Sequence, residues 1–269
     1  MTSTSGQYTL ATGAAAAHRL HLLHSAYSPV GRRVLQEAGV GPGMRVADFG
    51  CGVGATSAEL ARLVGPGGHV GIDYSGAQCE QARQVCAAQG LTNAAFIEAS
   101  AYATGLPRGS FDAVYCRFLL LHLTDPGAAL REMRDVLKPG GILVVEDGNL
   151  LSAGSMPPGA TQAFVDLFGR LGAKRNLNYG LADDLFHLVR DAGFPEPDVF
   201  IHQPAFARGD EKLLAQLSVV EIGPACVQEG LLTQAELDRT LADMERDALN
   251  PDVLVICPRM SLVWARKPR

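Results

Sequence analysis

The sequence ADFGCGVGAT, residues 47–56, places Gly50, Gly52 and Gly54 directly after a short apolar run. The run MRVADF (44–49) predicts a buried strand, and residues 55–63 predict a helix. Glycines in such a turn let the backbone bend tightly and approach a bound nucleotide closely. The segment GCGVGA also fits the dinucleotide pattern G-x-G-x-x-[GA], but a tight strand-to-helix turn without any ligand favours glycine too.

Asp48, two residues before the first glycine, discriminates between nucleotides. A pyrophosphate at the start of the helix is negatively charged, so a nearby carboxylate would repel it. A ligand that carries an ammonium and a sulfonium would be attracted instead. The sequence also lacks the phosphate loop G-x-x-x-x-G-K-[ST]. The turn therefore favours a cationic adenosine compound over NAD or ATP.

Strand and helix patterns alternate along the rest of the chain and predict an α/β, Rossmann-like fold, with a mostly parallel sheet and helices on both faces. We expect two short helices within 14–38, the second starting near Pro29, and further helices in 210–249, where Thr233 and Glu236 form a capping pattern. The other predicted strands are 69–74, 94–99, 111–116, 142–147, one within 194–206 and 260–267, and the other helices are 75–88, 126–137, 160–173 and 181–192.

Composition restricts the class of protein. The 269 residues carry a net charge of −5, which disfavours a nucleic-acid partner. The six cysteines, at 51, 79, 86, 116, 226 and 257, form no C-x-x-C pair, so we expect buried thiols in a reducing compartment.

His18, His21 and His24 spread around a helix, and we expect no metal site. The polar N-terminus and the lack of a long apolar stretch predict a cytoplasmic protein with no membrane partner.

Asp73 ends the second predicted strand, nineteen residues beyond Gly54. A carboxylate at this place can accept hydrogen bonds from both hydroxyls of a ribose that lies across the strand ends. An acid at a strand end can also cap the following helix. The glycine turn follows the preceding strand at the same edge of the sheet, and this placement favours the ribose role.

Four segments in order, VADFGCGVG, GIDYS, LPRGSFDAVYCRFLLLHLTDP and LKPGGILVVED, resemble the class I S-adenosylmethionine-dependent methyltransferases of small-molecule type, which act on quinones and natural products. The resemblance runs from about residue 40 to 150 and continues in AGF (192–194) and the last strand. It implies a seven-stranded sheet with an antiparallel last strand. The cofactor S-adenosyl-L-methionine would lie over the ends of strands one, two and four.

The resemblance also implies roles for residues at the ends of the first two strands. Asp48 would approach the methionyl ammonium, directly or through water, and Asp73 would hold the ribose. Backbone groups of Gly50, Cys51 and Gly52 would contact the methionyl part. Tyr74 would pack against the adenine.

Further roles follow at the ends of strands three and four. Ser100 stands where the family often has Asp, so its hydroxyl would replace a carboxylate beside the adenine, and Ala101 would offer its N–H. The carbonyl of Arg117 would meet the methionyl ammonium. Tyr8 and Tyr27 belong to an N-terminal segment that would fold over the cofactor or line the acceptor pocket, and packing is the alternative role for each.

Three residues are candidates for chemistry at the acceptor. His122, in FLLLHLTDP, is the leading general base, and a packed histidine that supports the loop is the alternative. Glu146 and Asp147 end the fifth predicted strand. One could hold a cationic acceptor or act as a base, and the other could cap the following turn.

The segment after strand four reads CRFL, without the prolines typical of amino-methylating nucleic-acid enzymes, and Cys116 lacks the Pro-Cys pair of cytosine C5 enzymes. We therefore expect a small organic acceptor methylated at oxygen, nitrogen or carbon, and a monomer or homodimer. One domain is expected, with an N-terminal lid (1–40), a cofactor core (41–150) and helical cap segments (150–180 and 210–250). Two alternatives stay open: a sensor or partner protein that binds the cofactor without turnover, and an NAD-dependent oxidoreductase, which Asp48 disfavours.

Overall fold

The structure is a computed structural model that describes residues 14–269, with side chains from residue 18 onward. The chain divides into two compact units. Among the described residues, the core unit comprises 27–149, 180–202 and 260–269, and the helical unit comprises 14–26, 150–179 and 203–259. That these units act as a single domain stays a prediction.

A seven-stranded sheet forms the centre of the core unit, in the order β3-β2-β1-β4-β5-β10-β7. The strands β3, β2, β1, β4 and β5 pair in parallel, whereas the last strand, β10, runs antiparallel to β7. This arrangement confirms the predicted Rossmann-like fold. The strands are β1 (Val46–Phe49), β2 (His69–Asp73), β3 (Ala94–Glu98), β4 (Phe111–Arg117), β5 (Leu137–Asn149), β7 (Asp198–His202) and β10 (Arg259–Arg266).

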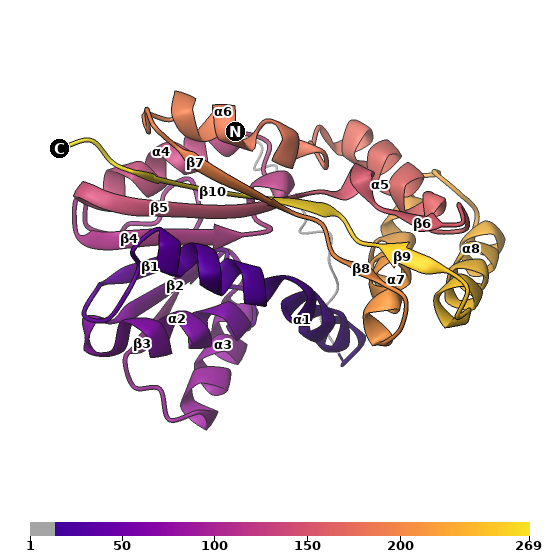
Figure 1. Cartoon of the computed structure of the whole chain (residues 1–269), viewed down its shortest axis with the longest axis horizontal. Coiled ribbons are helices and arrows are strands. Elements are labelled where there is room, and N and C mark those ends of the chain that lie inside the picture. The colour runs from indigo at the N-terminus through magenta and orange to yellow at the C-terminus, as the bar shows by residue number, and fades with distance from the viewer. Residues whose placement is uncertain (1–13) are drawn as a thin grey trace. The chain divides into compact units, whose positions relative to one another are not determined.

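Helices cover both faces of this sheet (Figure 1). α2 (Ala55–Val64) and α3 (Gly76–Ala88) lie on one face, and α4 (Pro126–Val136) and α6 (Leu185–Asp191) lie on the other. Side chains cap two of these helices: Ser75 accepts a hydrogen bond from the Gln78 N–H in α3, and Asp125 accepts one from the Ala128 N–H in α4. A capping side chain satisfies a backbone donor that the helix itself leaves unpaired, so these caps determine where α3 and α4 begin.

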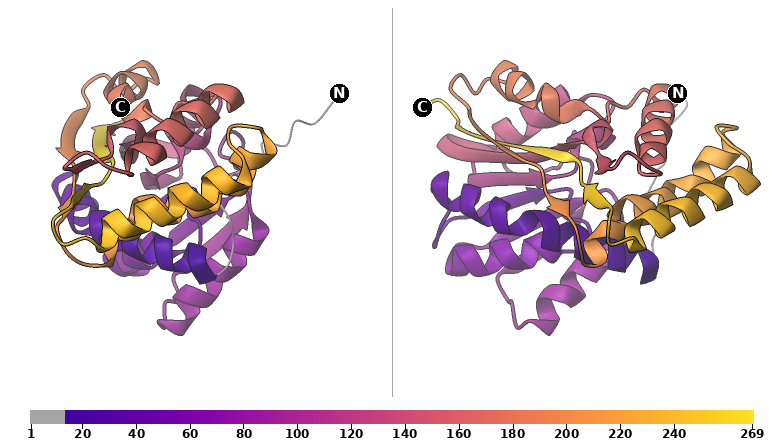
Figure 2. Two further views of the ribbon diagram at one scale, coloured as in Figure 1. Left: turned by 90° about the vertical axis from the view of Figure 1, so that its right-hand side faces the viewer. Right: turned by 45° about the vertical axis from the view of Figure 1, so that its right-hand side comes forward.

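The helical unit contains α5 (Gln162–Arg175), α7 (Leu214–Gln228) and α8 (Gln234–Leu249), and α7 packs against α8 (Figure 2). The predicted capping pattern of α8 is present, because Thr233 and Glu236 bond each other's backbone N–H. A small antiparallel sheet of β6 (Gly154–Met156), β9 (Leu254–Ile256) and β8 (Ala205–Phe206) completes the unit. β6 and β9 are too short to carry a periodic signal, so the sequence did not predict them. The strand expected within 194–206 is divided between β7 and β8, with Pro204 between them.

The N-terminal segment differs from the prediction. We expected two short helices, but α1 is a single helix from Ala14 to Glu37 with Pro29 inside it. An interior proline removes a hydrogen bond and clashes with the preceding turn, at a cost of about 3 kcal/mol. Packing opposes this cost, because Tyr27, Val34 and Leu35 are buried, whereas Pro29 itself is exposed.

Short 3-10 turns link several of these elements: η1 (Gly65–Gly67), η2 (Leu120–His122), η3 (Leu150–Ser152), η4 (Leu181–Asp183) and η5 (Asp210–Leu213). All six cysteines are buried free thiols. None of the helices in the described part of the chain has the length and apolar character needed to cross a bilayer.

Candidate active site

The glycine turn joins β1 to α2 and is fixed by the neighbouring strand. The N–H groups of Gly50 and Cys51 both donate to the carbonyl of Ile72 in β2, at 2.7 and 3.0 Å. Gly52 and Gly54 have φ angles of 53° and 86°, a left-handed conformation that favours glycine. A Cβ on Gly54 would also lie 2.7 Å from the Cα of Ala82 in α3. The turn can therefore pass this close to α3 only because residue 54 is glycine.

Asp48 is buried at the end of β1, with 2% of its surface exposed. Its Oδ2 accepts a hydrogen bond of 2.6 Å from Ser57 Oγ in α2 and lies 3.6 Å from His69 Nε2. These contacts hold the Asp48 carboxyl group between α2 and β2, and its role toward a cationic ligand stays a prediction.

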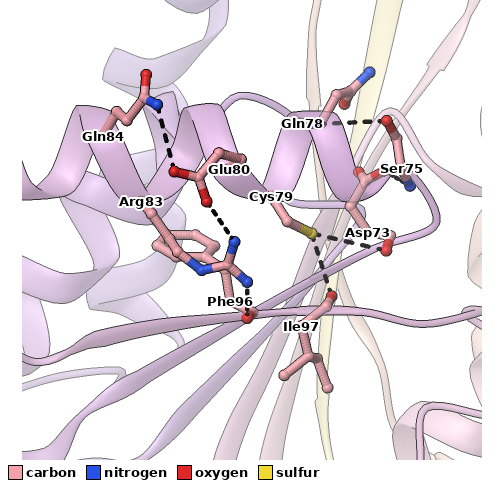
Figure 3. A network of polar contacts seen from close by, with 9 residues as sticks. All are labelled: Asp73, Ser75, Gln78, Cys79, Glu80, Arg83, Gln84, Phe96 and Ile97. Atoms are coloured by element: carbon pink, nitrogen blue, oxygen red, sulfur yellow. Dashed lines mark hydrogen bonds and ion pairs between the residues drawn. The ribbon is translucent and has the colours of Figure 1, made fainter.

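Asp73 is bonded to the glycine turn itself. Its Oδ2 accepts the N–H of Gly52 at 3.0 Å, and its Oδ1 accepts the N–H of Ser75 at 2.9 Å. Partial burial raises the pKa of Asp73, and these two N–H groups oppose the shift. Figure 3 shows Asp73 beside the start of α3, where the Cys79 thiol donates to the carbonyls of Asp73 and Ile97. The Tyr74 N–H also bonds this carboxylate, which has about four acceptor positions, so Asp73 retains capacity for a further hydrogen bond.

The residues expected beside an adenine follow β2 and β3. Tyr74 is 67% exposed, so its ring is open to a stacking partner. The N–H of Ala99 donates to the carbonyl of Asp73 at 2.9 Å, which brings the chain after β3 next to the end of β2. The hydroxyl of Ser100 accepts the N–H of Tyr102 at 3.2 Å, and Ala101 is partly buried.

Arg117 ends β4, and its side chain reaches two helices. One guanidinium nitrogen donates to Ser28 Oγ in α1 at 2.8 Å, and another donates to Thr56 Oγ1 in α2 at 2.5 Å. Burial lowers the pKa of Arg117, but the neighbouring Tyr115 and Glu146 outweigh it and the pKa is raised.

The chain turns sharply after Arg117. Phe118 has a φ of 51°, which is a strained conformation for an aromatic residue. Its N–H donates to the carbonyl of Glu146 at 2.9 Å, and its ring makes an edge-to-face contact with Tyr27, with 5.4 Å between the ring centroids. These contacts hold the backbone that carries the Arg117 carbonyl.

Glu146 and Asp147 point to opposite faces of β5, as adjacent strand residues do. Glu146 faces α1 and is completely buried. Neither of its oxygens has a hydrogen-bond partner of good geometry within the described residues. Burial raises its pKa to about 7, although the Arg117 guanidinium and the Tyr115 hydroxyl oppose the shift.

Asp147 binds the turn that carries His122. Its carboxylate accepts the N–H groups of Leu120, Leu121 and Gly148, at 2.7, 3.4 and 2.9 Å. Burial raises its pKa to about 7, against the effect of these bonds. The turn that Asp147 binds follows β4, whereas the sequence suggested a cap for the turn after the fifth strand. His122 is the last residue of η2 and is partly buried.

Sequence reasoning missed several residues at this site. Gln78 is buried, and its Oε1 lies 3.4 Å from the point where a Cβ on Gly52 would stand. Its position three residues after the capping Ser75 is the only signal in the sequence. Ser28 and Thr56, the partners of Arg117, carry no local signal because they are distant in the sequence. Tyr8, expected near the cofactor, lies outside the described residues.

Known proteins share this sequence pattern and fold. The ubiquinone/menaquinone biosynthesis C-methyltransferase UbiE of Shewanella sp. (strain W3-18-1) is 36% identical over 116 residues, which are 42% of this chain and 46% of that protein. The chain thus spans about half the length of the curated relatives it matches.

Two solved structures show the same fold. The YcgJ protein of Bacillus subtilis superposes with a TM-score of 0.61 at 19% identity, over 94% of this chain and 99% of that one. Phosphoethanolamine N-methyltransferase 2 of Haemonchus contortus, solved in complex with S-adenosyl-L-methionine, gives a TM-score of 0.55 at 16% identity, over 94% of this chain and 53% of that one.

The family model that describes a methyltransferase domain matches residues 41–176. This match covers the glycine turn, the sheet strands β1 to β5 and the first elements beyond them, about half of the chain. The chain therefore belongs to this methyltransferase family.

Proposed function

We propose that this protein transfers a methyl group from S-adenosyl-L-methionine to a small organic acceptor, and that the acceptor is a quinone-type ring in its reduced form. The hydrogen bond between Gly52 and Asp73 carries the cofactor assignment, because it unites the glycine turn and a ribose-binding carboxylate at one edge of the sheet. The buried negative charge of Asp48 beside them suits a cationic ligand.

The residues present fit this cofactor. Asp73 retains acceptor capacity for a ribose hydroxyl, and the exposed ring of Tyr74 offers a face to adenine. At the adenine edge, the Ala101 N–H would donate a hydrogen bond, and the Ser100 hydroxyl would accept one from the adenine amino group. Gly50, Cys51 and Gly52 would contact the methionyl part, whose ammonium would meet the Arg117 carbonyl and the charge of Asp48.

When bound, the cofactor supplies a methyl group on a positively charged sulfur that leaves as a neutral thioether. The protein aligns the acceptor with the S–CH₃ bond, and alignment supplies much of the acceleration. For a quinol ring, His122 would accept the proton of a ring hydroxyl, which makes the neighbouring ring carbon nucleophilic. The ring carbon would take the methyl group as the S–CH₃ bond breaks and would then lose its C–H proton to solvent. His122 would return its proton to the ring oxygen, which restores the quinol and the free base.

The activity of the curated relatives supports this acceptor class, since they are C-methyltransferases of quinone biosynthesis. Phe164, Phe168 and Tyr179 are buried and their rings contact one another in series, so these residues form part of the core of the helical unit.

Two measurements test the proposal. Calorimetry with S-adenosylhomocysteine and with NAD should show binding of the former alone, and preferential binding of NAD would contradict the cofactor assignment. Incubation with S-adenosyl-L-methionine and a chemically reduced naphthoquinone that lacks a ring methyl should give a C-methylated product by mass spectrometry and NMR. Cofactor binding without methylation of this quinol or of a broad metabolite extract would favour a protein that binds the cofactor without turnover.

A further inference from the structure

Arg117 joins two helices that are far apart in the sequence. Its guanidinium donates to Ser28 in α1 and to Thr56 in α2, across 89 and 61 residues of chain. Thr56 is the second residue of α2 and lies two residues after Gly54, at the end of the glycine turn. Ser28 is buried, so its hydroxyl has few alternative partners in solvent. The side chain of Arg117 is thus a direct link between α1 and the helix that the glycine turn begins.

The rigid fork of the guanidinium suits this link. Arginine presents five N–H donors in one plane and stays charged when it is buried, whereas lysine has a single ammonium on a flexible chain. Glu146 is the register partner of Arg117 across β4 and β5, so both side chains lie on the same face of the sheet. The fork geometry of the guanidinium, which lysine lacks, therefore favours arginine at this position.

Two further contacts bring the same part of α1 against the ends of β4 and β5. Gly31, one helical turn beyond Ser28, lies against the carboxylate of Glu146. Tyr27 packs edge-to-face on Phe118, the residue that follows Arg117. Residues 27–31 therefore contact the ends of both strands, next to the site where Arg117 binds Ser28.

We propose that Arg117 is a positioning residue that couples residues 27–37 of α1 to the glycine turn, so that a ligand in the turn orders this part of α1. The proposal rests on the proposed site of the cofactor at the glycine turn. A ligand that contacts Gly50–Gly52 restrains the first turn of α2, and Thr56 passes this restraint through Arg117 to Ser28. The link gives the side chain of Arg117 a role separate from that of its backbone carbonyl.

Hydrogen–deuterium exchange and calorimetry test this coupling on the full chain, with S-adenosylhomocysteine as the probe. The variants are Arg117→Met, Arg117→Lys, Ser28→Ala, Thr56→Val and the Ser28→Ala/Thr56→Val double variant. Arg131→Met is the matched control, since Arg131 is exposed on α4 and its ion pair with Asp125 is long, at 3.8 Å. Exchange is followed separately for peptides covering 27–37 and 48–56.

In the wild-type protein the probe should slow exchange in both segments. In Arg117→Met the slowing should persist at 48–56 and disappear at 27–37, and the affinity for the probe should fall about tenfold, the size expected for losing a charge-assisted hydrogen bond. Arg117→Lys should not restore the coupling. Ser28→Ala and Thr56→Val should each abolish it with non-additive effects on affinity, because each cuts the same link.

Equal slowing of exchange at 27–37 in the wild type and in folded Arg117→Met would overturn the proposal. If Arg117→Met does not fold, the two hydroxyl variants decide, and unchanged coupling in both would also overturn it. Exchange at 27–37 in Arg117→Met could also be faster than in the wild type both with and without the probe. If the probe then still slows exchange by the wild-type amount, Arg117 has a purely structural role and the coupling is contradicted. A wild-type protein that does not bind the probe would instead contradict the proposed function.

Discussion

The carboxylate of Glu146 occupies the space where a side chain on Gly31 would begin. A Cβ at residue 31 would lie 2.6 Å from Oε1 and 2.9 Å from Oε2 of Glu146. Gly31 lies inside α1, where glycine is an unfavourable residue by about 1 kcal/mol relative to alanine. The close approach of α1 to β5 explains why this helix position holds glycine.

Gly31→Ala should therefore destabilise the protein, although the same change stabilises most helices. Because Glu146 is completely buried, its carboxylate cannot move aside into solvent, and we expect a loss of about 1–3 kcal/mol in the free energy of unfolding. Gly169→Ala is the control, since a Cβ at this α5 position would meet only Leu151 at 3.7 Å, an ordinary contact. Thermal and denaturant unfolding measure both variants, and equal stabilisation by the two changes would refute the close fit.

The stability of the protein should depend on pH through Glu146. Burial raises its pKa from 4.5 to about 7, so the folded protein holds a proton that the unfolded chain releases. Glu146 therefore stabilises the fold fully at pH values below the pKa that it has in the unfolded chain. Its contribution to the free energy of unfolding is lost as the pH rises from about 5 to about 7. Glu146→Gln should flatten the pH dependence by up to about 1.4 kcal/mol per pH unit in this window.

Unfolding titrations at several pH values measure this slope. Glu80→Gln, at an exposed residue of α3, serves as the control and should leave the slope as in the wild type. Asp147, whose pKa burial also raises to about 7, should retain its own contribution in Glu146→Gln. A slope between pH 5 and 7 that is identical in Glu146→Gln and in the wild type would show that Glu146 is not protonated in the folded state.

Asp73→Asn should weaken binding of S-adenosylhomocysteine by about 1–3 kcal/mol, because one acceptor oxygen for the ribose becomes an amide donor. The change also disturbs the acceptor of the Gly52 N–H, which acts in the same direction. Asp112→Asn, whose carboxylate bonds Lys138 and the Arg45 N–H, is the control in the same unit. Calorimetry measures both variants, and an affinity equal to that of the wild type would remove Asp73 from the ribose role.

His122→Ala should slow methyl transfer by about 10²–10⁴-fold and leave the affinity for S-adenosylhomocysteine unchanged, because a general base acts on the acceptor and not on the cofactor. Single-turnover assays with the quinol acceptor measure the first quantity and calorimetry the second. His187→Ala, at an exposed position of α6, is the control. A turnover rate in His122→Ala equal to that of the wild type would leave His122 only a role in supporting the turn η2.

Breaking the buried ion pair of the helical unit should destabilise the protein strongly. Arg19 Nε lies 2.6 Å from Glu221 Oε1, and the two side chains are only 7% and 3% exposed. Arg19→Met leaves a buried charge without its partner, at a cost of about 3–5 kcal/mol. Arg246→Met, which breaks an exposed pair with Asp243, should cost less than about 1 kcal/mol. Equal losses in the free energy of unfolding in Arg19→Met and Arg246→Met would show that the buried pair does not carry the expected stability.

Most elements of the fold were predictable because their signals are local. The apolar run before Gly50 and the alternation of strands and helices identified the sheet, and Ser75 and Thr233 were recognised as caps from their own neighbourhoods. Local signals failed where packing opposed them. Pro29 predicted a break in α1, but burial on both sides of it keeps one helix.

The sequence by itself determined the family, the strand-and-helix order, and the glycines and acids at the strand ends, because these depend on neighbouring residues and short spacings. Only the tertiary structure decided which of them meet. It joined Asp73 to Gly52, set Glu146 against Gly31 and linked Arg117 to Ser28 and Thr56. These contacts depend on how strands and helices from distant parts of the chain pack, and no local pattern encodes the direction in which a buried side chain points.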